Sequence, residues 1–581
     1  LRLIIRNLKH KNAFEAYKAQ ILSMIADGYA EKVPTSILNR TDGFLFYLPH
    51  FPVYHPEKPG KVRVVNDCKA TFQNVSVNNV CLSGPDLLNK LIHVLLRFRL
   101  HEHAWAADVS AMYFQVRIPE NQRDMLRFLW IDDEENVVEY RMVGHVMGGI
   151  WSSASSTFAI RQAAIDNKCD AKVVNVIRRS LYVDDALHSE ECKEDAELTA
   201  YGCYSNMRKN HFNFCKYVST HPEILRRIPK ELHGETIKVI EGDPESKALG
   251  LRWNIGQDYF YYVRDTLTNF PDMTKRKLLS QVATLYDPLG LIQPIILIGK
   301  LIFQRVTRLG IEWDDLLPPA ELNAWKRWFE GLKNIHKLHF PRCLVGSLYV
   351  NAQKELHTFC DASELAYGTA TYLRAIPVEG EVKVILIMGK GRVAPNKALT
   401  IPRLELCSAL TAIKQEKVIT RETGLITSKR YFWTDSIIVL HYLKNPALRL
   451  KTFVARRVDA ILDSSTPDQW HHIRTDVNPA DVVSRGVKIA AEMPPLWING
   501  PAFLKLKESA WPVEVSTLPV PSAPLEVKTM MQDIYAEAPK LTRVSASTHR
   551  VPPLKSACYS GEHSCLIAVS APEHQPITLI D

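Results

Sequence analysis

The chain has 581 residues, of which 46% are hydrophobic and 23% charged, and its formal net charge at pH 7 is +9. This length exceeds what one hydrophobic core supports and indicates roughly three to five domains. The modest positive charge fits a protein that holds a polyanion along a groove but does not require one. The 11 cysteines are odd in number and form no CxxC pair. That pattern argues against a disulfide framework or a zinc ribbon and favours a reducing compartment.

No signal peptide or membrane span is evident in the sequence. The most apolar window, LYDPLGLIQPIILIGKLIF from Leu285, is broken by two prolines and a lysine. It is therefore too short to cross a bilayer. Because the first residue is Leu1 rather than Met, we expect a piece of a longer translation product or an incomplete gene model.

In chain order, the first elements are expected to be helical and the next ones extended. Residues 1–43 carry apolar side chains at helical spacing, and FLFYLPHFPVYHPEKPGKVRVV from Phe44 predicts short strands separated by proline turns. LSGPDLLNKLIHVLLRF predicts a turn and then an apolar helix. The segments AWAADVSAMYFQVRI and FLWIDDEENVVEYRMV predict strands, the second as a hairpin around residues 132–136.

The second half of the chain is expected to change from helices to a new α/β unit. TKRKLLSQVATLYDPLGLI and the residues up to about Tyr349 predict helices, and a second α/β pattern begins near Leu356. From Pro512 onward the chain holds nine of its 34 prolines together with many Ser and Thr residues. That composition is typical of a linker or a poorly ordered tail.

Two adjacent carboxylates, Asp184 and Asp185, stand between apolar runs in SLYVDDALH. Aspartate is common in tight turns, so this stretch alone is also compatible with an ordinary acidic hairpin. A nucleotidyl transferase needs two divalent cations about 3.5–4 Å apart, held by carboxylates. Asp108 ends the apolar strand in AWAADVSAMYFQV, where an unpaired charge would be costly. We therefore predict a catalytic metal site formed by these three aspartates.

Four further acids are placed at strand ends or helix starts. Asp361 ends the strand in ELHTFCDASE, Asp435 ends the strand in RYFWTDS, and Glu405 lies in the first turn of the helix in IPRLELCSAL. In VNPADVVSRG, Asn478 is the predicted N-cap, which puts Asp481 in the first helical turn. Side chains at such positions can converge, as a two-metal nuclease requires.

These motifs, in this order, resemble the reverse transcriptase and ribonuclease H of Pao (BEL) long-terminal-repeat retrotransposons. DVSAMYFQ and YVDD are similar to the first and third motifs of the polymerase palm, and GHVMGGIWSSASSTFA to the segment that supports template and nucleotide. PRLEL, WTDS and NPAD resemble the retrotransposon form of ribonuclease H, and ALGLRWN resembles the hairpin that grips the primer. The resemblance covers about Phe44 to Gly486.

The resemblance implies roles for five further residues. Arg63 matches a residue that contacts the triphosphate, Tyr113 an aromatic gate that excludes a 2′ hydroxyl, and Lys216 a lysine that follows the YxDD hairpin. Gly149 and Ser153 match the nucleotide-supporting loop. By residue type alone, Tyr113 is equally a core aromatic and Lys216 a solvated charge. The sequence departs from the family pattern at two places. Ala154 replaces a usual proline. The stretch WHHIRTDVNPAD lacks the glycine loop that carries a histidine in many ribonucleases H, so His471 and His472 are only weak candidates for that histidine.

The implied fold is α+β and multidomain: a right-hand polymerase with fingers, palm and thumb, a helical connection, and an α/β ribonuclease H-like domain. We expect a helical lead-in at 1–43, fingers and palm at 44–220, thumb and connection at 221–350, the nuclease at 351–490 and a linker or tail at 491–581. The implied partners are an RNA template, a DNA primer, an RNA–DNA hybrid and deoxynucleoside triphosphates, but no membrane. Two Mg²⁺ are expected per active site, with Mn²⁺ as a substitute.

The expected function is RNA-directed DNA synthesis linked to degradation of RNA in the hybrid, in the cytoplasm within a virus-like particle or in the nucleus. The sequence contains no DTG or DSG loop and no HHCC module, so neither an aspartic protease nor an integrase is predicted here. The alternative is a non-catalytic retrotransposon relic or a domesticated nucleic-acid-binding protein, which would explain Ala154.

Overall fold

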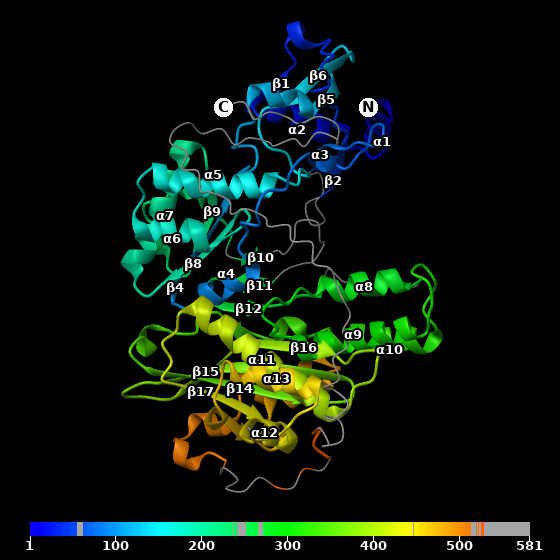
Figure 1. The fold of residues 1–581 in the computed structure, drawn as a ribbon. Coiled ribbons are helices and arrows are strands. Elements are labelled where there is room, and N and C mark those ends of the chain that lie inside the picture. Colours follow the sequence, from blue (N-terminus) through cyan, green and yellow to red (C-terminus); the bar gives the residue numbers. More distant parts are fainter. Residues whose placement is uncertain are drawn as a thin grey trace, which may run out of the picture.

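The computed structural model describes residues 1–54, 62–235, 237–240, 251–264, 270, 272–445, 447–512, 519, 521 and 524–527. Residues 528–581 of the expected tail and the first three residues of ALGLRWN lie outside this part. The described chain is an α+β structure built on several separate sheets, which follow one another from top to bottom in Figure 1.

The first unit packs two helices against a small antiparallel sheet of order β1-β6-β5. Its core contains Tyr17 and Trp130, both without exposed surface, and beside it stands a two-stranded hairpin. The elements are α1 (Arg2–His10), α2 (Phe14–Ala26), β1 (Ala30–Lys32), β5 (Arg127–Ile131), β6 (Val137–Met142) and the hairpin β2 (His50–Tyr54) with β3 (Val62–Asn66).

The second unit is a four-stranded antiparallel sheet of order β7-β8-β4-β9, covered by helices. Its central strand reads as an apolar run because both faces are buried: Trp105 packs under α5, α6 and α7, and Ala106 packs toward α4. The elements are β4 (His103–Val109), β7 (Leu181–Tyr182), β8 (Asp185–Glu190), β9 (Phe214–Ser219), α4 (Leu91–Phe98), α5 (Ser152–Asp166), α6 (Ala171–Arg179) and α7 (Lys193–Met207). The short helix α3 (Val77–Val80) packs in the core of the first unit.

A third sheet and three helices connect this unit to the C-terminal one. The sheet order is β10-β11-β12-β13, from β10 (Ile237–Ile240), β11 (Leu251–Asn254), β12 (Tyr259–Tyr261) and β13 (Phe340–Pro341). The helices are α8 (Lys275–Thr284), α9 (Gln293–Arg308) and α10 (Pro319–Gly331). The apolar window of the sequence is α9, whose buried face packs against the last sheet. Among the described residues, no helix has both the length and the apolarity needed to cross a membrane.

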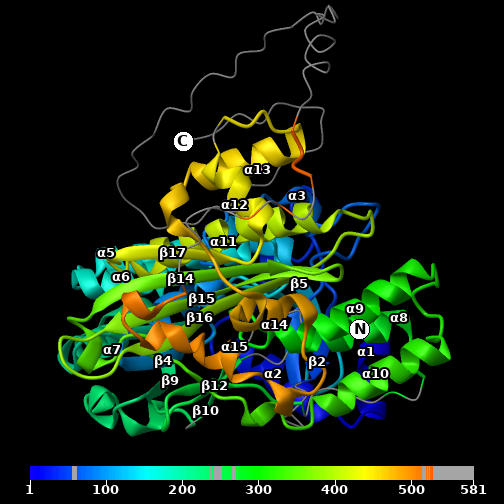
Figure 2. The ribbon, with the colours of Figure 1, turned by 90° about the horizontal axis from the view of Figure 1, so that it is seen from below.

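The C-terminal sheet has five strands in the order β16-β15-β14-β17-β18. The first three are antiparallel, and β17 and β18 run parallel to β14. Helices α11, α12 and α13 cover one face, while α14, α15 and α9 cover the other (Figure 2). The elements are β14 (Gln353–Ala362), β15 (Ala366–Ile376), β16 (Lys383–Val393), β17 (Lys429–Thr434), β18 (Trp470–His472), α11 (Ile401–Thr423), α12 (Ile437–Lys444), α13 (Thr452–Leu462), α14 (Pro479–Arg485) and α15 (Pro495–Asn499).

The start of the expected tail is packed structure, so its proposed beginning at residue 491 is too early. Trp497 is fully buried, and its carbonyl accepts a hydrogen bond of 2.6 Å from the Tyr372 hydroxyl. Arg374 donates to the carbonyl of Leu504 at 2.6 Å, and Trp511 packs over the same face of the sheet. The sheet needs this cover because its outer face is aromatic, a requirement that proline-rich composition does not reveal.

Two buried arginines, Arg99 and Arg342, join the end of α4 to the last two sheets. Arg99 donates to the carbonyls of Pro341, Arg342, Leu386 and Ile387, which belong to β13, its exit and β16. Arg342 binds the Asp258 carboxylate through two hydrogen bonds of 2.6 and 2.8 Å, and it also donates to carbonyls at the end of α4. Burial lowers the pKa of Arg99 to about 9.

Arg342→Met is expected to lower the free energy of unfolding by about 3–5 kcal/mol, because it leaves the carboxylate of Asp258 and several buried carbonyls without donors. The measurement is urea-induced unfolding followed by tryptophan fluorescence. Arg276→Met is the matched control, since Arg276 and its partner Asp314 are both exposed. Equal unfolding midpoints for the two variants would contradict the structural role of Arg342.

Two candidate carboxylate sites

The three aspartates of the first predicted site meet at one end of the β7-β8-β4-β9 sheet. Asp108, at the end of β4, is the register partner of Asp185, the first residue of β8. The Val109 amide donates to the Asp184 carbonyl at 2.7 Å, which ties the β7–β8 turn to β4. Val183, within the turn, has φ +53°, a left-handed conformation that is unusual for a β-branched residue. The turn thus holds Asp184 exposed and Asp185 beside Asp108.

Lys216 lies at the same edge and forms an ion pair with Asp108. It follows Cys215, which pairs with Asp108 across β4 and β9, and its own φ is +52°. The lysine side chain is 66% exposed and that of Asp108 is 17% exposed, so the ammonium group reaches the carboxylate from the solvent side. The structure therefore brings together four of the polymerase-site residues predicted from sequence.

The predicted nucleotide-loop residues form a second local group. The hydroxyls of Tyr113 and Ser153 are hydrogen-bonded at 2.8 Å, which links the turn after β4 to the first turn of α5. Gly149 lies just before α5, and a Cβ at this position would come within 2.8 Å of the Trp151 ring. Ala154 packs against Gly84 of the SGPDLL turn. The tyrosine is therefore anchored to the loop that the resemblance identifies.

Arg63 is exposed on β3, in the separate β2–β3 hairpin. The end of this strand touches the glycine loop: Gly148 has φ +108°, and a Cβ there would lie 2.4 Å from the Asn66 carbonyl oxygen. Only glycine permits this approach, which fixes β3 against the loop before α5.

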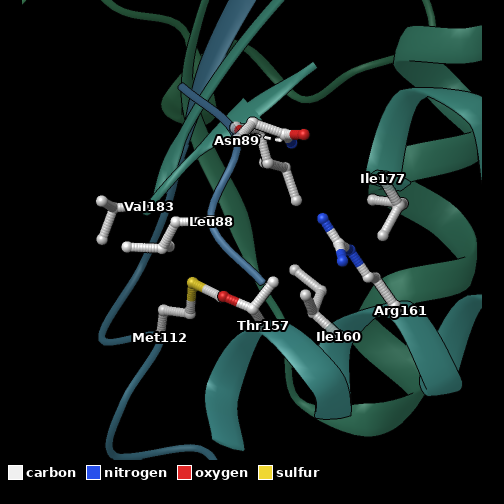
Figure 3. A pocket seen from close by; sticks show the side chains of 9 residues that line it. Leu88, Asn89, Met112, Thr157, Ile160, Arg161, Ile177 and Val183 are labelled. Atoms are coloured by element: carbon white, nitrogen blue, oxygen red, sulfur yellow. Dashed lines mark hydrogen bonds between the residues drawn. The ribbon is translucent and has the colours of Figure 1, made fainter. Parts of the chain in front are cut away.

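The turn that carries Asp184 rests on apolar packing. Met112, Ile160, Leu181 and Val183 line a cavity of about 10 Å³, around which Arg161 and Asn89 also converge (Figure 3). Such a volume holds about one water molecule. This cavity is therefore too small for a nucleotide.

The four acids of the second predicted site come from four elements of the C-terminal unit. Asp361 lies near the end of β14 and Asp435 directly after β17, which is its parallel neighbour. Glu405 follows the first turn of α11, which begins at Ile401 and so starts earlier than predicted, and Asp481 is in the first turn of α14, whose N-cap Asn478 accepts from the Ala480 amide at 3.0 Å. Parallel neighbours end at the same edge, so the acids gather there.

Each of these four acids accepts a hydrogen bond from a nearby side chain. Glu405 accepts from the Ser436 hydroxyl at 2.5 Å, and Asp435 accepts from the Thr475 hydroxyl at 2.6 Å. Asp361 accepts from the Ser484 hydroxyl, and Asp481 from Arg485 at 2.5 Å. Sequence reasoning did not single out these donors. Ser436 and Ser484 were detectable in principle, because they lie one and three residues after predicted acids.

The acids also act on one another electrostatically. Burial raises the pKa of Asp361 to about 8, and repulsion from Asp435 and Asp481 adds to this shift. Burial also raises the pKa of Glu405, with a further contribution from Asp435. The four carboxylates thus form one mutually repelling group.

The donor chemistry of this group fits a hard divalent cation, which prefers carboxylate oxygens and would relieve the repulsion. Asp361, Glu405, Asp435 and Asp481 are the residues that would hold it. Within the described ranges, however, no three Asp, Glu, His or Cys side chains are already close enough to share one ion. The fit of a divalent cation to this site therefore rests on the carboxylate oxygens and on the convergence of the four acids.

His471, which sequence left as a weak candidate, takes part in aromatic packing. Its ring lies 5.1 Å from that of Trp433 and 5.5 Å from that of Tyr431, measured between centroids. His471 therefore contributes from the edge strand β18 to the aromatic face of the sheet.

Comparison with known proteins identifies the relatives of these two units. Residues 274–436 match the family model described as Pao retrotransposon-like RNaseH-like domain. The foamy viral protease-reverse transcriptase solved with an RNA/DNA hybrid aligns with a TM-score of 0.50 at 14% identity, covering 79% of this chain and 54% of that one. The same protein solved with dsDNA gives 0.49 at 15% identity, covering 80% and 83%. No curated protein matches the chain.

At these identities the solved structures are evidence for the fold alone, and only the first alignment is strong enough to use. Fold and family match together define a retroelement region with a reverse transcriptase-like fold and a ribonuclease H-like domain. The match to the Pao family is limited to the segment that runs from α8 to the residue after Asp435.

Asp361→Asn is expected to stabilise the protein by about 2 kcal/mol at pH 8 in the absence of divalent cations. Below its ordinary pKa of 3.8, Asp361 is protonated in both folded and unfolded chains. Between there and about pH 8 only the folded chain keeps the proton, so stability falls as the pH rises. Asp361→Asn has no carboxyl group at this position, so its stability does not fall in this way. The measurement is urea-induced unfolding at pH 5, 6.5 and 8 in EDTA.

The control for this experiment is Asp476→Asn, because Asp476 is an exposed aspartate near the same site, paired with Arg474. If Asp361→Asn and Asp476→Asn have the same pH dependence of unfolding, the buried repulsion described for Asp361 is wrong.

Proposed function

We propose that the chain is an RNA-directed DNA polymerase with a linked ribonuclease H activity that cuts the RNA strand of RNA–DNA hybrids. The single observation that carries the proposal is the presence of two separate carboxylate groups, each gathered from distant segments at the edge of its own sheet. The Pao family match supports the nuclease assignment, and the likeness to a foamy viral protease-reverse transcriptase bound to a hybrid supports a nucleic-acid substrate.

In the polymerase, Asp108, Asp184 and Asp185 would hold two Mg²⁺ ions. These ions, or Mn²⁺, supply activation of the primer 3′ hydroxyl and neutralisation of the triphosphate. Lys216 would leave Asp108 and stay at the edge, where its ammonium group can contact phosphate. Arg63 would bind the triphosphate through its bidentate guanidinium. Tyr113, fixed by its bond to Ser153, would exclude a 2′ hydroxyl.

In the nuclease, Asp361, Glu405, Asp435 and Asp481 would hold the corresponding pair of ions. The hydroxyls of Ser436, Thr475 and Ser484 orient these carboxylates and keep them at the sheet edge. Under this proposal, residues 1–43 are the lead-in and residues 44–220 form the fingers and palm, with the β7-β8-β4-β9 sheet as the palm, while β10–β13 with α8–α10 form the thumb and connection.

The second candidate function is that of a non-catalytic relic or a domesticated nucleic-acid-binding protein. The specific observation in its favour is Ala154, which stands where the family usually has proline. A well-folded chain that binds the hybrid but neither extends a primer nor cuts RNA would establish this alternative.

Asp184→Asn is expected to reduce primer extension on a poly(rA) template with Mg²⁺ by about 100-fold or more, because an amide is a poor ligand for the ion that aligns the primer. Cleavage of RNA in a hybrid should be unchanged, since the second site is built from other elements. Asp133→Asn, at an exposed aspartate of the β5–β6 turn, is the control and should extend normally.

Asp435→Asn should give the reverse result: hybrid cleavage reduced by about 100-fold or more and primer extension retained. Release of short RNA fragments from a labelled hybrid is the measurement, with Asp476→Asn as the nearby control. Loss of both activities in either variant would refute the assignment of separate sites.

A further inference from the structure

A short C-terminal segment lies beside the nuclease site. Residues 524–527 run between α12 and the start of α13: Val527 pairs with Leu450, and the Lys451 amide donates to the Glu526 carbonyl at 2.9 Å. The Glu526 amide donates to the hydroxyl of Tyr442 at 3.0 Å, and Leu525 packs on the apolar cluster under α12. The segment is therefore held by backbone and side-chain contacts together.

The carboxylate of Glu526 is bound by Arg403 in a two-pronged arrangement. The guanidinium Nε and Nη2 donate to the two carboxylate oxygens at 2.6 Å each. Arg403 lies in the first turn of α11, two residues before Glu405. Its guanidinium stacks on the Phe453 ring at 4.7 Å, and Arg457 stacks on the same ring at 3.5 Å. Two guanidinium groups thus flank one aromatic ring next to a predicted catalytic acid.

The location of this pair is close to the nuclease carboxylates. Burial raises the pKa of Tyr442, and the charges of Glu526, Arg403 and Glu405 all act on the same phenol. The phenol of Tyr442 is therefore affected by three charged groups: the carboxylate of Glu526, the guanidinium of Arg403 and the carboxylate of Glu405, a predicted nuclease acid.

The chemistry of the pair matches a phosphate contact. A guanidinium binds carboxylate and phosphate through the same parallel fork, so a carboxylate can occupy the place of a phosphate. The side chains of Arg403 and Glu526 are 33% and 19% exposed, so water and solutes reach the pair. Because the pair is bidentate, a phosphate that takes the place of the carboxylate must replace both hydrogen bonds of the fork.

We propose that Arg403 binds a backbone phosphate of the nucleic acid that enters the nuclease site, and that Glu526 occupies this phosphate position until the nucleic acid displaces it. The inference extends the proposed nuclease function and rests on it for the identity of the strand. It makes residues 524–527 a built-in competitor that weakens hybrid binding.

The test is binding of a fluorescent RNA–DNA hybrid to the full chain in EDTA, measured by anisotropy at several salt concentrations. Glu526→Gln should tighten binding about threefold to fivefold and make the slope of log K against log salt steeper by about 0.9, one phosphate contact. Arg403→Gln combined with Glu526→Gln should return both values to those of the wild type. Glu508→Gln is the matched control, because Glu508 is a C-terminal acid paired with Lys429 and should leave both values unchanged.

Unchanged binding in Glu526→Gln, or a gain that persists when Arg403 is also replaced, would overturn the proposal. Thermal unfolding of Glu526→Gln should match the wild type, which excludes a general loss of structure as the cause of a null result. Because EDTA removes catalysis, the readout is independent of nuclease activity. A gain that depends on Arg403 in a chain that never cuts the hybrid would uphold the contact and reject the nuclease.

Discussion

The arrangement of the chain depends on two buried guanidinium groups, those of Arg99 and Arg342, which have no exposed surface and need hydrogen-bond acceptors. A buried guanidinium is costly unless every donor finds an acceptor. Arg99 and Arg342 meet this condition only when α4, the β10–β13 sheet and β16 are all in place, since their acceptors come from all three. Displacing any one of these elements would leave a buried charge unpaired. The junction of α4, the β10–β13 sheet and β16 therefore resists partial opening.

This junction determines how the two carboxylate sites are related. The first is built on β4, which follows α4 directly, and the second on β14, two strands from β16 in the same sheet. The two sites also differ in charge balance. At the first, the ammonium of Lys216 accompanies Asp108, whereas at the second, burial raises the pKa of Asp361 and repulsion from Asp435 and Asp481 adds to the shift.

An Asp at the end of a buried strand is costly unless paired or metal-bound, and this rule places some of the candidate acids from the sequence, whereas their role as metal ligands stays a prediction. Asp361 and Asp435 are recognisable in this way from local patterns alone. The donors were not predictable to the same degree: Thr475, which donates to Asp435, lies 40 residues away in the chain. Such partners depend on strand pairing and register, which hydropathy does not specify.

The borders of the nuclease unit also depend on packing that local sequence patterns do not predict. Periodicity places its start near Leu356, where the first strand begins, yet the family match begins at residue 274, with α8. The packing explains the difference, because α9 buries its apolar face against β16 while residues 495–511 cover the same side of the sheet. A sheet with two apolar faces requires helices or loops on both, and nothing restricts these to the sequence between its strands. The folded unit thus includes segments that precede and follow its strands in the sequence. A nuclease fragment that begins at residue 351 would expose the face of the sheet that α9 covers.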